Sequence, residues 1–138
     1  MNRGDLQKLS NQRRKEALVL LRAKQYQGAY YLAGYSVECA LKSCISKQTK
    51  RHDFPDKKFA MKVFTHDIRS LVRAAGLEQQ LGLDVRGNNH LEINWTIVKD
   101  WSEQARYKLA ISRREAEDLY SACTSRTNGV LPWVRKHW

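Results

Sequence analysis

Residues 29–47, AYYLAGYSVECALKSCISK, decide the fold class, because their apolar side chains repeat with the period of an α-helix. The apolar face of this helix comprises Val37, Leu41, Cys44 and Ile45. Small side chains mark a second face, on which another helix could approach closely, and these are Ala29, Ala33, Gly34, Ser36 and Ala40. The stretch therefore predicts a long, buried helix from about Ala29 to Lys47.

A third face of this predicted helix is polar and aromatic, with Tyr31, Tyr35, Glu38 and Lys42. Glu38 precedes Lys42 by four residues, which is the favourable order for an ion pair within a helix and is worth about 0.3 kcal/mol at an exposed site. The same two side chains could instead orient a ligand phosphate or form a polar patch at a dimer interface. The structural and the functional interpretation both stay open at this point.

The flanking sequence predicts further helices, because no segment of useful length alternates apolar and polar residues as a strand does. The predicted helices run from Asp5 to Lys24, from His66 to Ala75 after a Thr65 cap, from His90 to Leu109 after an Asn89 cap, and onward from the Ser112–Glu115 capping box. The predicted breaks are Gln25 to Gly28, residues 48–64 around Pro55, Gly82 to Asn89, and Asn128 to Pro132. We therefore expect an all-α fold, an antiparallel up-down bundle of four long helices and one short helix.

The length, hydrophobic content and cysteine positions of the chain predict a single intracellular domain. The chain has 138 residues, of which 42% are hydrophobic, so residues 1–138 are expected to form one helical domain. The longest apolar run, Ala17 to Leu21, is far shorter than the ~18 residues of a membrane span, and the N-terminus lacks the apolar segment of a secretory signal. Cys39, Cys44 and Cys123 form no CxxC pair and lie at apolar helical positions, which predicts buried, reduced thiols in the cytoplasm.

The formal net charge of +11 is uneven along the chain. Residues 1–64 hold 14 Lys and Arg against 5 Asp and Glu, a balance of +9, whereas residues 65–138 hold 11 against 9, a balance of +2. Such a field concentrates polyanions near the protein and speeds their encounter with it. The charge favours contact with a nucleic acid or a nucleotide over a merely solvated basic surface.

Three elements of the sequence resemble the HEPN domain family in order and spacing, over about Leu18 to Trp138. They match its Y-x-x-E-x-x-L-K, H-D-x-x-x-L and W-x-x-x-x-R-Y patterns with Tyr35, Glu38, Leu41 and Lys42, with His66, Asp67 and Leu71, and with Trp101, Arg106 and Tyr107. Along the chain, the segment AYYLAGYSVECALK is followed by FPDKK, then by THDIRSLVRAAGL and then by WSEQARY, which is the order in the family. The resemblance implies a helical bundle that dimerises, in prokaryotic toxin–antitoxin or phage-defence systems and often beside a nucleotidyltransferase.

Many HEPN proteins cleave RNA without a metal, with an Arg and a His separated by four to six residues, and this chain departs from that pattern. Its four histidines lack an Arg at the required spacing, and Arg86 and His90 are separated by only three residues. Counting forward from Arg106, the matching positions hold Ile111, Ser112 and Arg113. Ser112 cannot transfer a proton near neutral pH as His does. The usual ribonuclease motif is therefore absent.

Three functions stay open. The favoured one is a HEPN-like dimeric module that binds RNA or a nucleotide through Lys42, Lys50, Arg51, Lys57, Lys58 and Arg106. The second is an RNA-cleaving toxin with a noncanonical site, whose candidate catalytic residues are Arg106, Tyr107, His66 and Glu38. The third is a protein-binding partner of a nucleotidyltransferase. Basic residues of segment 48–64 alternate with Phe54, Phe59 and Phe64, which suits single-stranded RNA and equally suits a loop whose aromatic rings pack on the bundle.

No metal or other cofactor is expected. The pairs His52-Asp53 and His66-Asp67 suggest a metal phosphohydrolase, but that chemistry needs further ligands, and His66-Asp67 is more simply the start of a helix. A homodimer is expected, because the small-residue face and surplus aromatic side chains exceed what one small bundle needs to bury. These aromatic residues are Tyr30, Tyr31, Trp133 and Trp138.

Overall fold

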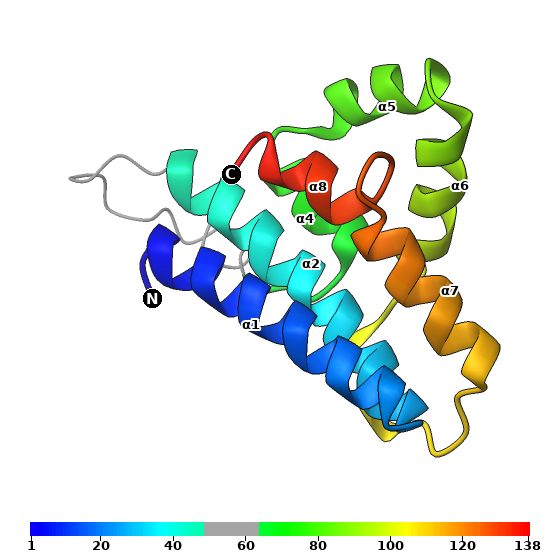
Figure 1. Ribbon diagram of the computed structural model, residues 1–138. Helices are drawn as coiled ribbons and strands as arrows, with labels where there is room; N and C mark the ends of the chain where they lie inside the picture. Colours follow the sequence, from blue (N-terminus) through cyan, green and yellow to red (C-terminus); the bar gives the residue numbers. More distant parts are fainter. Residues whose placement is uncertain (49–63) are drawn as a thin grey trace.

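The computed structural model describes residues 1–48 and 64–138, and these residues form helices and turns without a strand. In chain order the elements are α1 (Arg3–Arg22), α2 (Tyr26–Gln48), α4 (Ile68–Ala74), α5 (Glu78–Arg86), α6 (Asn89–Val98), the 3-10 helix η1 (Glu103–Tyr107), α7 (Arg113–Thr124) and α8 (Val130–Arg135). Figure 1 shows α1 and α2 running side by side in opposite directions. The all-helical class is confirmed. No helix within these two ranges combines the length and the apolarity that crossing a membrane requires.

Helix α1 begins two residues earlier than predicted, because Asn2 and Asp5 form a capping box. The Asn2 side chain accepts a hydrogen bond from the Asp5 amide at 2.8 Å, and the Asp5 carboxylate accepts one from the Asn2 amide at 3.1 Å. The break after α1 also lies earlier than predicted, at residues 23–25, where Lys24 adopts a left-handed φ of 62°. Gly28 is part of α2, where an added Cβ would lie 3.1 Å from Leu20 of α1.

Helix α2 is the centre of the fold and contacts α1, α4, α7, α8 and η1. All the small residues of its predicted close-approach face are buried: Ala29, Ala33, Gly34, Ser36 and Ala40. The Ser10 hydroxyl of α1 donates a hydrogen bond to the Ser36 carbonyl at 2.7 Å, so the two helices lie close together. This face is therefore used within one chain, and dimerisation stays a prediction that has to rest on another surface.

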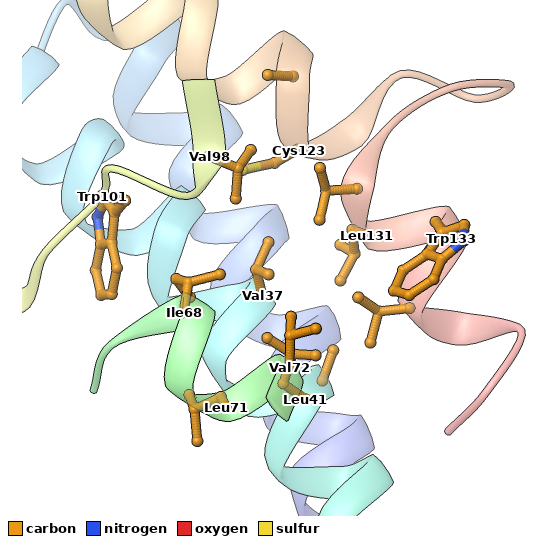
Figure 2. Close-up of a cluster of buried hydrophobic side chains, with 14 of the residues drawn as sticks. Val37, Leu41, Ile68, Leu71, Val72, Val98, Trp101, Cys123, Leu131 and Trp133 are labelled. Atoms are coloured by element: carbon orange, nitrogen blue, oxygen red, sulfur yellow. The ribbon is translucent and has the colours of Figure 1, made fainter. Parts of the chain in front are cut away.

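The core lies between α2 and the helices that follow it. Figure 2 shows Val37 and Leu41 of α2 facing Ile68, Leu71 and Val72 of α4, with Leu131 and Trp133 of α8 nearby. The three thiols are buried as predicted, and burial raises the pKa of Cys39 and of Cys44 from 9.0 to about 11. At neutral pH these thiols are protonated and act as small apolar side chains.

Helix α5 replaces much of a predicted loop, so the loop expected from Gly82 to Asn89 is wrong for residues 82–86. Glycine is a poor helix former, but its cost of about 1 kcal/mol is smaller than the gain from burying apolar side chains. Leu81 is buried and Val85 packs against the core, and both lie on one face of α5. The cap of α6 is also one residue earlier than predicted, because Asn88 rather than Asn89 accepts the hydrogen bond from the Leu91 amide.

The predicted helix from His90 to Leu109 is interrupted. Helix α6 ends at Val98, the chain turns at Lys99 and Asp100, and Ser102 caps η1 by accepting a hydrogen bond from the Gln104 amide at 3.2 Å. The apolar spacing of Trp101 and Ala105 continues through this turn and both residues are buried, so periodicity alone did not reveal the break.

The cap of the short helix α4 is Asp67, not Thr65. Its carboxylate accepts hydrogen bonds from the amide and the hydroxyl of Ser70, at 3.1 and 2.6 Å. The Ser112 cap of α7 is confirmed, with a 3.1 Å hydrogen bond from the Glu115 amide. A break at Asn128-Gly129 is confirmed too, and Pro132 lies in the first turn of α8, where its missing N–H has no helical partner to lose. The described residues thus divide into two long helices and a set of shorter ones, not into four long helices and one short helix.

Candidate functional site

Glu38 is a carboxylate buried in the middle of α2, with a side chain that is 1% exposed. Its Oε1 accepts hydrogen bonds from Lys42 Nζ at 2.8 Å and from His66 Nδ1 at 2.5 Å. The predicted Glu38–Lys42 contact is confirmed, and its burial makes it different from a surface pair. A buried charge is costly unless donors surround it, and loss of one donor leaves much of that cost uncompensated.

His66 lies between two carboxylates. Its Nδ1 faces Glu38, and its Nε2 lies 3.2 Å from Oε2 of Glu103 in η1. Each ring nitrogen of His66 thus faces one carboxylate, and the contacts join Glu38, Lys42, His66 and Glu103 into one group of ionisable side chains. These four residues are called the Glu38 cluster below.

Trp101 attaches the segment before η1 to helix α2. An added Cβ at Gly34 would lie 2.2 Å from the Trp101 ring, so only glycine admits the indole there. The Trp101 ring also stacks on Tyr31 with a centroid distance of 6.1 Å, and Tyr31 stacks on Tyr35 at 5.9 Å. Figure 2 shows Trp101 beside α2 at the edge of the core. This packing fixes where η1 begins, and hence where Glu103 lies.

Arg106 and Tyr107 form an exposed pair at the end of η1. The Arg106 guanidinium lies 4.7 Å from the centre of the Tyr107 ring, and Tyr107 is 66% exposed. Gln27 of α2 holds the backbone of this helix, since its amide donates to the carbonyl oxygens of Arg106 at 2.6 Å and of Ala105 at 3.3 Å. Tyr107, and to a smaller extent Glu103 and Tyr31, raise the pKa of Arg106, which stays cationic.

Two buried polar atoms of Glu38 and Trp101 have no hydrogen-bond partner within the described ranges. They are Oε2 of Glu38 and the indole Nε1 of Trp101, on side chains that are at most 2% exposed. An unsatisfied buried polar atom costs about 1–3 kcal/mol, and such atoms are rare in a well-packed core. Three more such atoms lie elsewhere in the described residues, on Arg14, Ser43 and Arg135, so the case for a site here rests on the buried Glu38 carboxylate and its partners.

The structure brings the four candidate catalytic residues together as two pairs, Glu38 with His66 and Arg106 with Tyr107. His66 contacts Glu38 directly, and Arg106 and Tyr107 share η1 with Glu103, the second partner of His66. Lys42 belongs to the same cluster through Glu38. The other candidate binding residues, Lys50, Arg51, Lys57 and Lys58, lie outside the described residues. Glu103 was missed by the sequence analysis, because no local pattern marks a contact between residues 37 positions apart.

The adjacent residues His66 and Asp67 have different structural roles. His66 faces the Glu38 cluster, and Asp67 caps α4 through Ser70. The described part of the chain holds no group of three His, Cys, Asp or Glu side chains placed to bind a metal ion. His52 and Asp53 lie outside it.

Comparison of the chain with models of protein families, with curated proteins and with solved structures finds no match. The function of the site is therefore inferred from its own residues.

Proposed function

We propose that the chain is an RNA- or nucleotide-binding module and that the Arg106–Tyr107 pair, with the Glu38 cluster beside it, forms the contact surface. The observation that carries the proposal is the exposed Arg106 guanidinium over the exposed Tyr107 ring. Arginine suits a phosphate because its planar fork donates two parallel hydrogen bonds. An exposed aromatic ring gives a nucleobase a surface on which to stack, worth about 1–3 kcal/mol per base.

Charge supports this proposal. The net charge of +11 attracts polyanions to the protein, although most of it lies in residues 1–64 and not in the half that holds Arg106. Arg106 makes no ion pair with an acidic side chain of the described residues, so its charge is available to a ligand. Lys42, in contrast, is largely buried and donates to Glu38, which gives it a positioning role for His66 rather than a direct phosphate contact.

The wider setting of the proposal is a HEPN-like module that works as a dimer in a toxin–antitoxin or phage-defence system. Its support is the resemblance in the sequence elements around Glu38, His66 and Arg106, of which Glu38 and His66 are in contact. A nucleotidyltransferase encoded next to this chain would strengthen this setting.

RNA cleavage is a second candidate, favoured by the 2.5 Å contact between Glu38 and His66. A buried carboxylate that holds Nδ1–H of a histidine leaves Nε2 as the nitrogen that can take a proton from a ribose hydroxyl. Arg106 would then stabilise the charge on the phosphate. We rank binding first because Nε2 already faces Glu103, which has to move before His66 can act as a base.

The test is binding of a fluorescein-labelled single-stranded RNA of twelve nucleotides, followed by fluorescence anisotropy at low salt. Arg106→Gln is expected to weaken binding about tenfold and to reduce the slope of log K against log salt by about 0.7. The matched control is Arg86→Gln, since Arg86 is also an exposed arginine in the last turn of a helix, α5. Equal losses in the two variants, or no binding by the unchanged protein, would contradict the proposal.

Cleavage is tested with the same RNA in the presence of a chelator. If cleavage products appear with the unchanged protein and disappear with His66→Gln, RNA cleavage becomes the better supported of the two candidate functions. Intact RNA with undiminished binding leaves the binding module as the function.

A further inference from the structure

A groove of about 260 Å³ opens between α4, α5 and the end of α6. Its floor is apolar and comprises Val72 of α4, Leu81 and Val85 of α5, and Trp95 of α6. Among the described residues that line it, none belongs to the Glu38 cluster or to the Arg106–Tyr107 pair. The groove is therefore a second surface, independent of the proposed RNA contact.

Gly82 keeps this groove open. It lies in the middle of α5 and lines the groove, and an added Cβ there would meet no atom within 4 Å. A glycine inside a helix is less favourable than alanine by about 1 kcal/mol, and neither crowding nor a left-handed φ requires it at this position. A small residue here preserves space above the floor.

The rim of the groove holds three basic side chains and one acidic side chain, Glu78. It carries Arg69 and Arg73, one turn apart on α4, and Lys99 after α6. Each arginine already contacts one carboxylate, Arg69 with Asp100 at 3.1 Å and Arg73 with Glu78 at 3.4 Å. A guanidinium has five N–H donors, so each arginine can hold a second carboxylate. Lys99 has no acidic partner within residues 1–48 and 64–138.

We propose that this groove binds an acidic peptide segment of a partner protein. One bulky apolar side chain of the segment packs on the floor beside Trp95, and carboxylates on either side of it contact Arg69, Arg73 and Lys99. The volume favours a peptide, because sites that enclose a whole small molecule span roughly 300–1,000 Å³ and this groove is smaller. The three cations around the floor supply the charge complementarity that orients an acidic partner.

The experiment is selection of twelve-residue peptides from a random display library on the immobilised full chain, followed by measurement of Kd for the enriched peptides. Gly82→Leu fills the groove, and Gly82→Ala is its matched control, because alanine leaves most of the space open. Both variants are expected to fold, since nothing lies near the new side chain and both residues are better helix formers than glycine. Circular dichroism checks the folding of each.

The enriched peptides are expected to share a large apolar residue flanked by Asp or Glu. Their affinity should fall at least about tenfold in Gly82→Leu and in the double variant Arg69→Gln with Arg73→Gln, and stay unchanged in Gly82→Ala. Failure to enrich such sequences, or equal affinity for the unchanged protein and Gly82→Leu, would overturn the proposal. Loss of RNA binding in Gly82→Leu would assign the groove to nucleic acid instead and would overturn it as well.

Discussion

Helix α2 buries polar side chains on two faces and satisfies them differently. Toward α1, the Ser10 hydroxyl donates to the Ser36 carbonyl and the Ser36 hydroxyl donates to the Ala33 carbonyl, at 2.7 and 2.6 Å. These groups are neutral and both hydroxyls have a partner, whereas the buried Ser43 hydroxyl, two turns further along α2, has none among the described residues. Toward α4 and η1, Glu38 carries a charge and only one of its two oxygens is bonded among the described residues. The two faces therefore differ in charge, because one buries neutral hydroxyl groups and the other buries a carboxylate held by two donors.

The largest expected effect of a single substitution comes from Gly34, where α2 meets Trp101. Gly34→Ala should lower the free energy of unfolding by about 3 kcal/mol, because the new methyl group and the Trp101 ring cannot occupy the same space. Ala33→Gly, at a fully packed neighbouring position, should cost only about 1.5 kcal/mol from helix propensity and one lost methyl group. Urea denaturation measures both. A smaller loss for Gly34→Ala than for Ala33→Gly would show that Trp101 is not held as described.

The next effect tests the charge of Glu38. Glu38→Gln should destabilise the fold by about 2 kcal/mol, less than the 3–5 kcal/mol of a fully buried pair, because Lys42 and His66 are partly exposed and can turn toward solvent. Ser10→Ala on the other face removes one neutral hydrogen bond and should cost about 1 kcal/mol. Equal losses in urea denaturation would remove the distinction between the two faces.

Alkaline pH gives a third effect, through the thiols. The pKa of Cys39 and of Cys44 rises from 9.0 to about 11, so the folded state holds the proton more tightly than the unfolded state. The stability linked to these thiols is complete below pH 9 and is lost as pH rises toward 11, on the order of 2 kcal/mol for each. Denaturation curves at pH 8 and pH 11 measure the loss.

Glu38→Gln distinguishes the two thiols. After burial, the neighbouring Glu38 carboxylate is the next cause that raises the pKa of Cys39, whereas Cys44 lacks this influence. The variant should therefore lower the pKa of Cys39 and leave that of Cys44 unchanged, as measured by ultraviolet absorbance of the thiolate in single-cysteine proteins. Parallel shifts at both positions would argue against a charged Glu38.

The smallest effect on stability is expected from the basic segment outside the described residues. Replacing Lys50, Arg51, Lys57 and Lys58 by Gln should leave the unfolding free energy unchanged within about 0.5 kcal/mol, since Lys and Arg side chains are rarely part of a packed core. It should flatten the salt dependence of RNA binding, which for about four neutralised phosphates has a slope near −3. An unchanged slope would move the binding face to Arg13, Arg14 and Lys15 of α1.

Sequence patterns located the long helices because burial there follows the helical period. The predicted stripe from Val37 to Ile45 is buried, and the ends of α1 and α2 differ from the predicted ends by one to three residues. The patterns failed where a single tertiary contact outweighs local preference. Gly82 lies in a helix because Leu81 and Val85 pack inward, and the helix predicted through Trp101 stops because its indole occupies the space above Gly34.

The site was predictable only as separate parts. The spacing of Glu38 and Lys42 indicated their contact, and the resemblance indicated His66, Arg106 and Tyr107 as candidates. Which side chains meet depends on the turn after α6, which no local pattern specifies. That turn brings Glu103 to His66 and so completes the Glu38 cluster.

The contact between Gly34 and Trp101 has a consequence for divergence. A side chain at position 34 and an indole at position 101 exclude each other, so neither position can drift alone without loss of packing. In any protein that shares this fold, the two positions should covary, a larger residue at one accompanying a smaller residue at the other. Position 101 also sets where η1 begins. A larger residue at position 34 together with a smaller one at position 101 would therefore preserve the packing of the fold but displace Glu103. Such a protein would keep the helical fold and lose the Glu38 cluster.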